Sequence, residues 1–193
     1  MRRKLGILIS GRGSNMAALV EAARAPDCPY EVALVASDKP EAEGLAWAAE
    51  QGIATFAQSP RGMAKAEYEA RIDAALREAG VEAIALAGYM RLLSDDFVAR
   101  WRRRILNVHP SLLPKYKGLD THARAIEAGD SHGGVSVHIV TEELDGGEVL
   151  GQAEVAILPG DTAESLAERV LKEEHRLYPR IVAEFLCPKN LQG

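Results

Sequence analysis

The sequence predicts a single α/β domain, in which helices flank a mostly parallel central sheet that ends in an antiparallel C-terminal edge. Short apolar runs alternate with amphipathic stretches over the first 110 residues, an order typical of parallel strands connected by helices on both faces of a sheet. Further along, two apolar runs are joined by a Gly-rich turn, which indicates an antiparallel hairpin. A length of 193 residues with 47% hydrophobic residues is enough for one sizeable core.

The expected strands of the first half are short and apolar. Ala83–Ala87 is apolar at every position, as expected for a central strand buried on both faces. The expected helices carry apolar residues at helical spacing, for example Tyr68, Ile72 and Leu76. The strands are expected over Leu5–Ser10, Val32–Ser37, Ala54–Phe56, Ala83–Ala87 and Ile105–His109, and the helices over Ser14–Arg24, Glu43–Gln51, Ala66–Ala79 and Ser94–Trp101.

The second half begins with a loop rich in Pro, Lys and Gly over Pro110–Asp120. A short helix is expected next, over Thr121–Ala128. The strands Val135–Val140 and Glu148–Ala156 are separated by the turn Leu144–Gly147, and we expect them to form the antiparallel edge of the sheet.

A long helix is the last expected element, and it begins after Gly160. Asp161 and Glu164 have the spacing of a capping box. Pro179 lies inside this helix and is expected to kink or split it, because proline has no N–H to donate. We expect the domain to span residues 1–187 and a polar tail to follow over residues 188–193.

The composition narrows the classes of function. The net charge is −5, from 23 Lys and Arg against 28 Asp and Glu, which argues against general binding to nucleic acid or to an anionic membrane. Cys28 and Cys187 lack the spacing of a metal site and are too few for a disulfide framework. The apolar run after Met1–Lys4 is too short for a signal peptide, and no run approaches the about 18 apolar residues of a membrane span. We therefore expect a cytoplasmic protein with no membrane or nucleic-acid partner.

A glycine-containing turn, Ser10-Gly11-Arg12-Gly13-Ser14-Asn15, follows the first expected strand and opens the first expected helix. Glycines permit a tight turn, and the free N–H groups at a helix start attract anions. The turn lacks the third glycine of a dinucleotide-binding fingerprint, and no acidic residue is clear at the end of the second strand. The motif predicts either a phosphate site or a turn that caps the helix without a ligand.

A second motif, Asn107-Val108-His109-Pro110-Ser111-Leu112-Leu113-Pro114, begins inside an expected strand. Residues two apart on a strand face the same side, so Asn107 and His109 project together. Pro110 ends the strand and leaves both side chains at its carboxyl end, where open α/β sheets bind ligands. An amide donor beside a titratable ring suits acyl transfer. The alternative is a polar strand end with a hydrogen-bonded core histidine.

Two further patterns carry less information. The acidic turn over residues 141–147 is, taken alone, most simply a solvated loop. No pair of histidines has the spacing of a metal-binding helix, so no metal is expected.

Four segments of the sequence occur in the same order as in the 10-formyltetrahydrofolate-dependent formyltransferases and resemble them. The resemblance covers the chain from about Leu5 to Phe185 and extends to the branch that formylates glycinamide ribonucleotide. It implies a Rossmann-like formyltransferase fold and an enzyme of purine biosynthesis. It also implies 10-formyltetrahydrofolate as co-substrate, no metal, and a monomer or homodimer. The four segments are Gly11–Asn15, Ala87–Leu93, Asn107–Pro114 and Leu144–Gly147.

The resemblance also implies site residues. Asn107, His109 and Asp145 would be the catalytic trio. The ribonucleotide would be held by Gly13, Ser14 and Asn15 at its phosphate and by Glu174 at its ribose hydroxyls. Lys117 departs from the family, in which Pro is common at this position. The folate would be bound by Lys65, Met90, Arg91, Leu92, Leu93, Asn107, Thr141, Glu142, Glu143, Leu144 and Asp145.

The predicted reaction is transfer of the formyl group from N10 of the folate to the primary amine of glycinamide ribonucleotide. Asn107 and a charged His109 would stabilise the oxyanion, and Asp145 would favour the charged ring and move a proton. Another folate-dependent formyltransferase or a formyltetrahydrofolate hydrolase is one alternative, but these normally carry a further domain. A non-catalytic nucleotide-binding α/β module is another, and it does not explain the catalytic trio.

Overall fold

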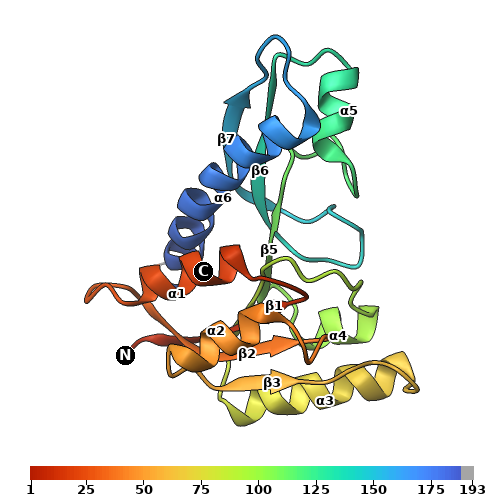
Figure 1. Cartoon of the computed structure of the whole chain (residues 1–193). Coiled ribbons are helices and arrows are strands. Elements are labelled where there is room, and N and C mark those ends of the chain that lie inside the picture. Colours follow the sequence, from red (N-terminus) through yellow and green to blue (C-terminus); the bar gives the residue numbers. More distant parts are fainter. Residues whose placement is uncertain (188–193) are drawn as a thin grey trace.

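Seven strands form one sheet at the centre of the molecule, in the order β3-β2-β1-β4-β5-β6-β7 (Figure 1). This computed structural model describes residues 1–187, so the expected tail over residues 188–193 lies outside the described part. Strands β1 to β5 pair in parallel, whereas β6 pairs antiparallel with β5 and β7. The predicted fold class, with its antiparallel C-terminal edge, is confirmed. The strands are β1 (Arg3–Ile9), β2 (Tyr30–Ser37), β3 (Thr55–Ala57), β4 (Ala83–Leu86), β5 (Ile105–His109), β6 (His132–Ile139) and β7 (Val149–Ala156).

Helices cover both faces of the sheet. Helices α1, α2 and α6 pack on an apolar core that includes Ile7, while α3 and α4 pack on one that includes Leu8. Successive strand residues face opposite sides, which is why these two neighbours lie in different cores. Figure 1 shows α1 and α3 on opposite sides of the sheet. Apart from the last helix, for which only the start was predicted, the expected ends of the elements lie within three residues of the observed ones. The helices are α1 (Ser14–Ala23), α2 (Glu43–Glu50), α3 (Lys65–Glu78), α4 (Asp95–Arg100), α5 (Thr121–Glu127) and α6 (Ala163–Leu186).

The cap of α6 differs from the expected one. Thr162 is the N-cap, and its hydroxyl accepts from the backbone N–H of Ser165, whose own hydroxyl accepts from the backbone N–H of Thr162. Asp161 instead accepts from the backbone N–H of Leu158 and pairs with Arg169. The predicted box of Asp161 and Glu164 is therefore wrong by one residue, because the acidic residue is used to anchor the preceding turn.

Pro179 does not split α6, which runs unbroken as a helix of 24 residues. An interior proline costs about 3 kcal/mol or more, but this helix buries Tyr178, Ile181 and Val182 against the sheet. Each such side chain contributes about 1.5–3 kcal/mol when fully buried. Tyr178 also places its hydroxyl 3.0 Å from the backbone oxygen of Leu86. Tertiary packing therefore outweighs the local cost, and the expected split is wrong.

The strand order places the polar motifs at one edge of the sheet. The carboxyl ends of β1, β4 and β5 lie side by side, and they lead into the glycine turn, the segment after Ala87 and the loop after His109. Strand β6 returns antiparallel and sets His138 directly opposite Asn107. No helix among residues 1–187 combines the length and the apolar character needed to cross a membrane.

Candidate active site

Two cavities open at the carboxyl ends of β4 and β5, the part of an open α/β sheet where ligands bind. The first cavity has a volume of about 680 Å³ and the second a volume of about 650 Å³. They adjoin, because several residues line both, and we call this common boundary the shared wall. The residues of the shared wall are Tyr89, Arg91, Leu92, Asn107, Leu144 and Asp145.

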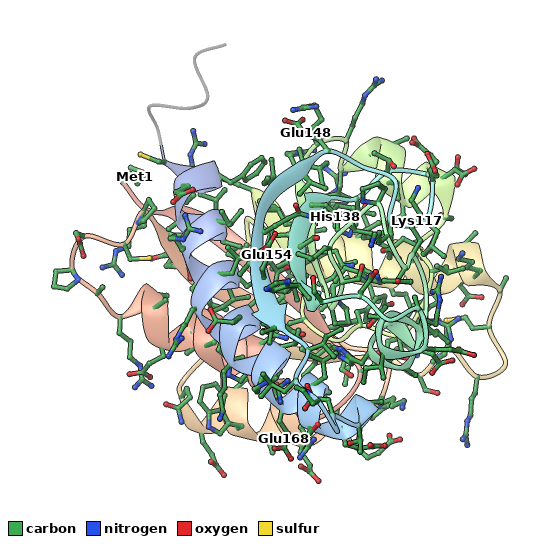
Figure 2. The ribbon with its side chains drawn as sticks, turned by 90° about the horizontal axis from the view of Figure 1, so that it is seen from above. Met1, Lys117, His138, Glu148, Glu154 and Glu168 are labelled. Atoms are coloured by element: carbon green, nitrogen blue, oxygen red, sulfur yellow. The ribbon has the colours of Figure 1, made fainter. Side chains whose placement is uncertain are left out.

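Asn107 is held on β5 by its cross-strand neighbour His138. Its Nδ2 lies 3.2 Å from Nε2 of His138, and Nδ1 of that ring lies 3.0 Å from the backbone oxygen of Ile139. If Nδ1–H donates to this oxygen, Nε2 is free to accept from the Asn107 amide. Nδ2 then keeps its second N–H for a ligand. Figure 2 labels His138 near the middle of the view, on the strand that carries it.

His109 lies at the last position of β5 and is buried. Its Nε2 lies 2.9 Å from the backbone oxygen of Tyr116, and its Nδ1 lies 3.4 Å from Oδ2 of Asp145. A carbonyl and a carboxylate can only accept hydrogen bonds, so the doubly protonated, positively charged ring satisfies both contacts. The surroundings of His109 are therefore arranged for an imidazolium.

Asp145 reaches His109 from the turn between β6 and β7. Its backbone adopts a left-handed conformation with φ of 49°, and only 7% of its side chain is exposed. Oδ2 accepts from the backbone N–H of Gly118 at 2.9 Å, and Oδ1 lies 3.5 Å from Nε2 of His138. Burial alone would raise the pKa of Asp145, but the adjacent His138 ring, the hydrogen bond from the backbone of Gly118 and the His109 ring hold that pKa below its usual value. Asp145 is therefore an anion at neutral pH.

The turn that carries Asp145 lies tightly against β6. A Cβ atom on Gly147 would lie 1.8 Å from the backbone oxygen of Ile139, so only glycine fits there. On the other side, Lys117 pairs with Glu143 at 2.7 Å. Lys117, which departs from the family pattern, thus joins the loop after β5 to the turn. Figure 2 labels Lys117 to the right of His138. The structure brings Asn107, His109 and Asp145 together in the second cavity, and Asn107 and Asp145 also belong to the shared wall.

The residues expected to hold the ribonucleotide lie where α1 meets α6. Gly13 is the N-cap of α1 with φ of 73°, and no side chain caps this helix, so its first N–H groups remain open to an anion. Nδ2 of Asn15 donates to Oε2 of Glu174 at 2.6 Å, while Oδ1 of Asn15 is buried without a partner among the described residues. Asn15 and Glu174 line the second cavity, whereas Gly13 and Ser14 lie beside it.

Glu174→Gln is expected to raise the free energy of unfolding of the ligand-free protein near pH 8. Burial raises the pKa of Glu174, and the hydrogen bond from Asn15 offsets only part of that rise. A carboxyl whose pKa is higher in the folded state favours folding while it is protonated, and it loses this contribution as the pH rises through the folded pKa. A neutral Gln avoids the loss and can still accept from Asn15.

The gain from Glu174→Gln should therefore shrink as the pH falls toward about 4, where the unfolded carboxyl also becomes protonated. Urea unfolding at both pH values measures it. Glu168→Gln is the control, because Glu168 is exposed on the same helix (Figure 2) and its exchange should leave the unfolding curve unchanged. A gain of equal size at both pH values would contradict the buried-charge explanation.

The residues expected to bind folate line the first cavity, with one exception. Lys65 begins α3 and contributes to this cavity, as do Arg91 and Leu93. Met90 lines the second cavity instead, with its side chain 69% exposed. The turn contributes Thr141, Glu142, Glu143, Leu144 and Asp145 to the first cavity.

Some contacts of the site have no signal in the sequence. The carbonyl of Tyr116 and the N–H of Gly118 are backbone groups, which nearly every residue type supplies and which therefore leave no mark on the sequence. The expectation that no acidic residue lies at the end of the second strand was wrong. Asp38 follows β2 directly, and it is buried. Its carboxylate accepts from Ser10, and it lines neither cavity, so it does not act as the ribose-binding acid of a dinucleotide site. Within residues 1–187, no group of three or more His, Cys, Asp or Glu side chains is arranged to hold a metal ion.

A family model described as formyl transferase matches residues 3–182. The chain belongs to the formyl transferase family. The resemblance found in the four sequence segments is thereby confirmed, and with it the expectation of a formyltransferase enzyme. The chain is similar to a solved structure of phosphoribosylglycinamide formyltransferase from Brucella melitensis. It has 52% identity and a TM-score of 0.93, and the match covers 97% of each chain.

Two curated members of the family have similar lengths. Phosphoribosylglycinamide formyltransferase from Haemophilus influenzae is 40% identical over 95% of this chain and 87% of that protein. The enzyme of the same name from Escherichia coli is 42% identical over 93% of this chain and 85% of that protein. A trifunctional purine biosynthetic protein from Drosophila melanogaster is 45% identical, but the chain spans 14% of its length.

Proposed function

We propose that this chain transfers a formyl group from N10 of 10-formyltetrahydrofolate to the primary amine of glycinamide ribonucleotide, a step of purine biosynthesis. The observation that carries the proposal is that Asn107, His109 and Asp145 meet in the second cavity, where Asn107 and Asp145 also form the boundary with the first. A reaction between two bound substrates needs such a boundary, since the reacting atoms must approach from opposite sides. The names of the Brucella, Haemophilus and Escherichia relatives support the choice of substrates.

Each cavity takes one substrate. The first cavity is bordered by the turn over residues 141–145 and is lined by apolar side chains together with polar groups, which suits the flat pterin and the aromatic ring of a folate. The second cavity contains Asn15 and Glu174 next to the start of α1. A phosphate fits the N–H groups of that helix start, and the ribose hydroxyls can donate to the carboxylate of Glu174.

The chemistry begins when the nitrogen of the ribonucleotide amine attacks the formyl carbon, and the formyl oxygen gains negative charge. The second N–H of Asn107 and the positive ring of His109 stabilise this oxyanion. The attacking nitrogen then loses a proton to Asp145, directly or through one water, since the carboxylate is ionised. When the carbon–N10 bond breaks, that proton passes to N10. The balanced products are the formylated amide and tetrahydrofolate.

Two alternative functions, a hydrolase and a module without catalysis, differ from formyl transfer in what they release. If water replaces the amine, the products are formate and tetrahydrofolate, as in a formyltetrahydrofolate hydrolase. A nucleotide-binding module without catalysis binds both ligands and releases no product. We further propose a cytoplasmic monomer or homodimer that acts on these small molecules and binds neither nucleic acid nor a membrane.

An assay of the purified chain with 10-formyltetrahydrofolate and glycinamide ribonucleotide tests the function. We expect deformylated folate to appear only when the ribonucleotide is present, in amounts equal to the formylated ribonucleotide. Formate release without the ribonucleotide would favour the hydrolase, and binding of both ligands without product would favour the module.

Gly13→Val is expected to weaken binding of the ribonucleotide by about tenfold or more, because a β-branched residue is strained at φ of 73° and would distort the start of α1. Folate binding should change little, since Gly13 lies outside the first cavity. Isothermal titration with each ligand measures both affinities. Gly52→Val is the matched control, because Gly52 has φ of 76° and open space around its Cβ position. Equal weakening of both ligands by Gly13→Val would contradict separate subsites.

A further inference from the structure

The segment over residues 88–93 supplies half of the shared wall, namely Tyr89, Arg91 and Leu92, and two of its residues are largely exposed. Met90 is 69% exposed and Leu92 68% exposed. Side chains this open have few packing neighbours to orient them, so the backbone from which they project must be fixed by other contacts. The segment begins at Gly88, whose φ of 73° turns the chain away from β4.

Hydrogen bonds to β1 fix this backbone. The parallel pairing of β1 and β4 continues past Leu86, because the N–H of Ala87 donates to the oxygen of Leu8 at 2.9 Å and the N–H of Ser10 donates to the oxygen of Gly88 at 3.2 Å. The next bond uses a side chain. The N–H of Met90 donates to the hydroxyl oxygen of Ser10 at 2.9 Å.

The hydroxyl of Ser10 is itself oriented by a buried carboxylate. Ser10 is 4% exposed and Asp38 is 7% exposed, and the hydroxyl donates to Oδ1 of Asp38 at 2.6 Å. A hydroxyl has one hydrogen, and a carboxylate can only accept. Because Asp38 takes that hydrogen, the lone pairs of Ser10 are left to receive the N–H of Met90.

A buried carboxylate is costly to a fold, and an apolar residue at such a position often serves stability better. Asp38 lines neither cavity, and within residues 1–187 its carboxylate forms no ion pair with a cationic side chain. Its distinctive contribution is the direction of the Ser10 hydroxyl. Tyr68 of α3 makes two further contacts with the segment over residues 88–93. Its hydroxyl lies 2.9 Å from that of Tyr89, and its ring lies under the guanidinium of Arg91.

We infer that Ser10 and Asp38 are positioning residues, which hold the shared wall at the separation that formyl transfer requires. Their action passes through the N–H of Met90 and touches neither substrate. The inference rests on the proposed function for its kinetic readout, whereas the stiffness of the wall can be measured without any ligand.

The test compares Ser10→Ala with Ser37→Ala. Ser37 is a buried serine at the end of the neighbouring strand β2, and its hydroxyl accepts from the backbone N–H of Lys39 at 3.1 Å. Both variants remove a serine hydroxyl that accepts from a backbone N–H, and Ser10→Ala also removes the hydrogen bond to Asp38. Only Ser10→Ala affects the wall. Hydrogen exchange of the 88–93 segment in the ligand-free protein, and kcat and KM for both substrates, are measured for each.

Ser10→Ala should speed exchange across residues 88–93 and lower kcat by about tenfold, the order expected for one hydrogen bond that sets a reacting geometry. KM should change less than kcat, since the cavities keep their other lining groups. Ser37→Ala should match the wild type in both measurements. Asp38→Asn should shift both in the same direction as Ser10→Ala, because the amide of Asn can donate to Ser10 and release its hydrogen.

Other outcomes overturn the inference. If exchange speeds up at Met90 alone, or across the segment with unchanged kcat, the hydrogen bond from Met90 to Ser10 does not hold the wall for catalysis. A fall in kcat shared by Ser37→Ala would be a general loss of stability. If Asp38→Asn matches the wild type, the role of Asp38 is wrong. If the wild type shows no formyl transfer, the proposed function fails, and the exchange data alone decide whether Ser10 and Asp38 hold the wall.

Discussion

Asp145→Asn should lower kcat by about 10²–10⁴-fold while both substrates still bind, the range that a general acid–base group typically contributes. The Asn side chain keeps the shape of Asp. Its amide oxygen can still accept from the N–H of Gly118, which in the wild type donates to Oδ2 of Asp145. It is neutral, however, so it cannot balance the positive ring of His109 at 3.4 Å or take the proton of the attacking amine. The loss should therefore fall on the chemical step.

Initial rates of folate deformylation at saturating substrates measure this loss, and titration of each ligand measures binding. Asp161→Asn is a matched control, because the side chain of Asp161 is also 7% exposed and pairs with Arg169 outside both cavities. It is expected to lower stability and leave kcat near the wild-type value. Near-normal turnover of Asp145→Asn would reduce Asp145 to a residue that shapes the turn.

Asn107→Ala should lower kcat by about 10²–10³-fold, the usual effect of removing one donor from an oxyanion site. Nδ2 is held 3.2 Å from Nε2 of His138, so its second N–H is oriented before the substrates arrive. Such a donor costs no reorganisation as the negative charge develops. The alanine variant keeps the backbone of β5, since the register with β6 depends on main-chain pairing.

The measurement for Asn107→Ala pairs kcat with the dissociation constant of each substrate. An oxyanion donor acts mainly in the transition state, so kcat and kcat/KM should fall together. A rise in KM at constant kcat would instead mean that Asn107 binds the ground state. The thermal midpoint of unfolding checks that the variant remains folded.

Much of this architecture could be predicted, because local patterns and tertiary packing agree. Ala83–Leu86 is apolar throughout and lies in the middle of the sheet, and β5 ends at His109 as Pro110 indicates. The convergence of the polar motifs at one edge follows from parallel strands. The proximity of Asp145 to His109 was predicted from the family resemblance alone. The two residues are 36 positions apart, and no local pattern specifies that the turn carrying Asp145 folds back onto His109.

The remaining differences have physical causes. Pro179 stays helical because burial of its neighbours outweighs a missing hydrogen bond. Thr162 caps α6 because Asp161 is engaged by Arg169. The carbonyl that fixes His109 belongs to Tyr116, and a backbone atom leaves no trace in residue type. Asp38 was overlooked because a single acid after a strand does not reveal whether it faces a ligand or a buried serine.

The shared wall makes the two cavities thermodynamically one system. Tyr89, Arg91 and Leu92 line both cavities. If the first ligand to bind orders these residues, the second ligand does not have to bear that entropic cost again. The resulting coupling free energy belongs to the pair of ligands and not to either one. Whatever factor the folate adds to the affinity of the ribonucleotide, the ribonucleotide must add to the affinity of the folate, in whichever order they arrive.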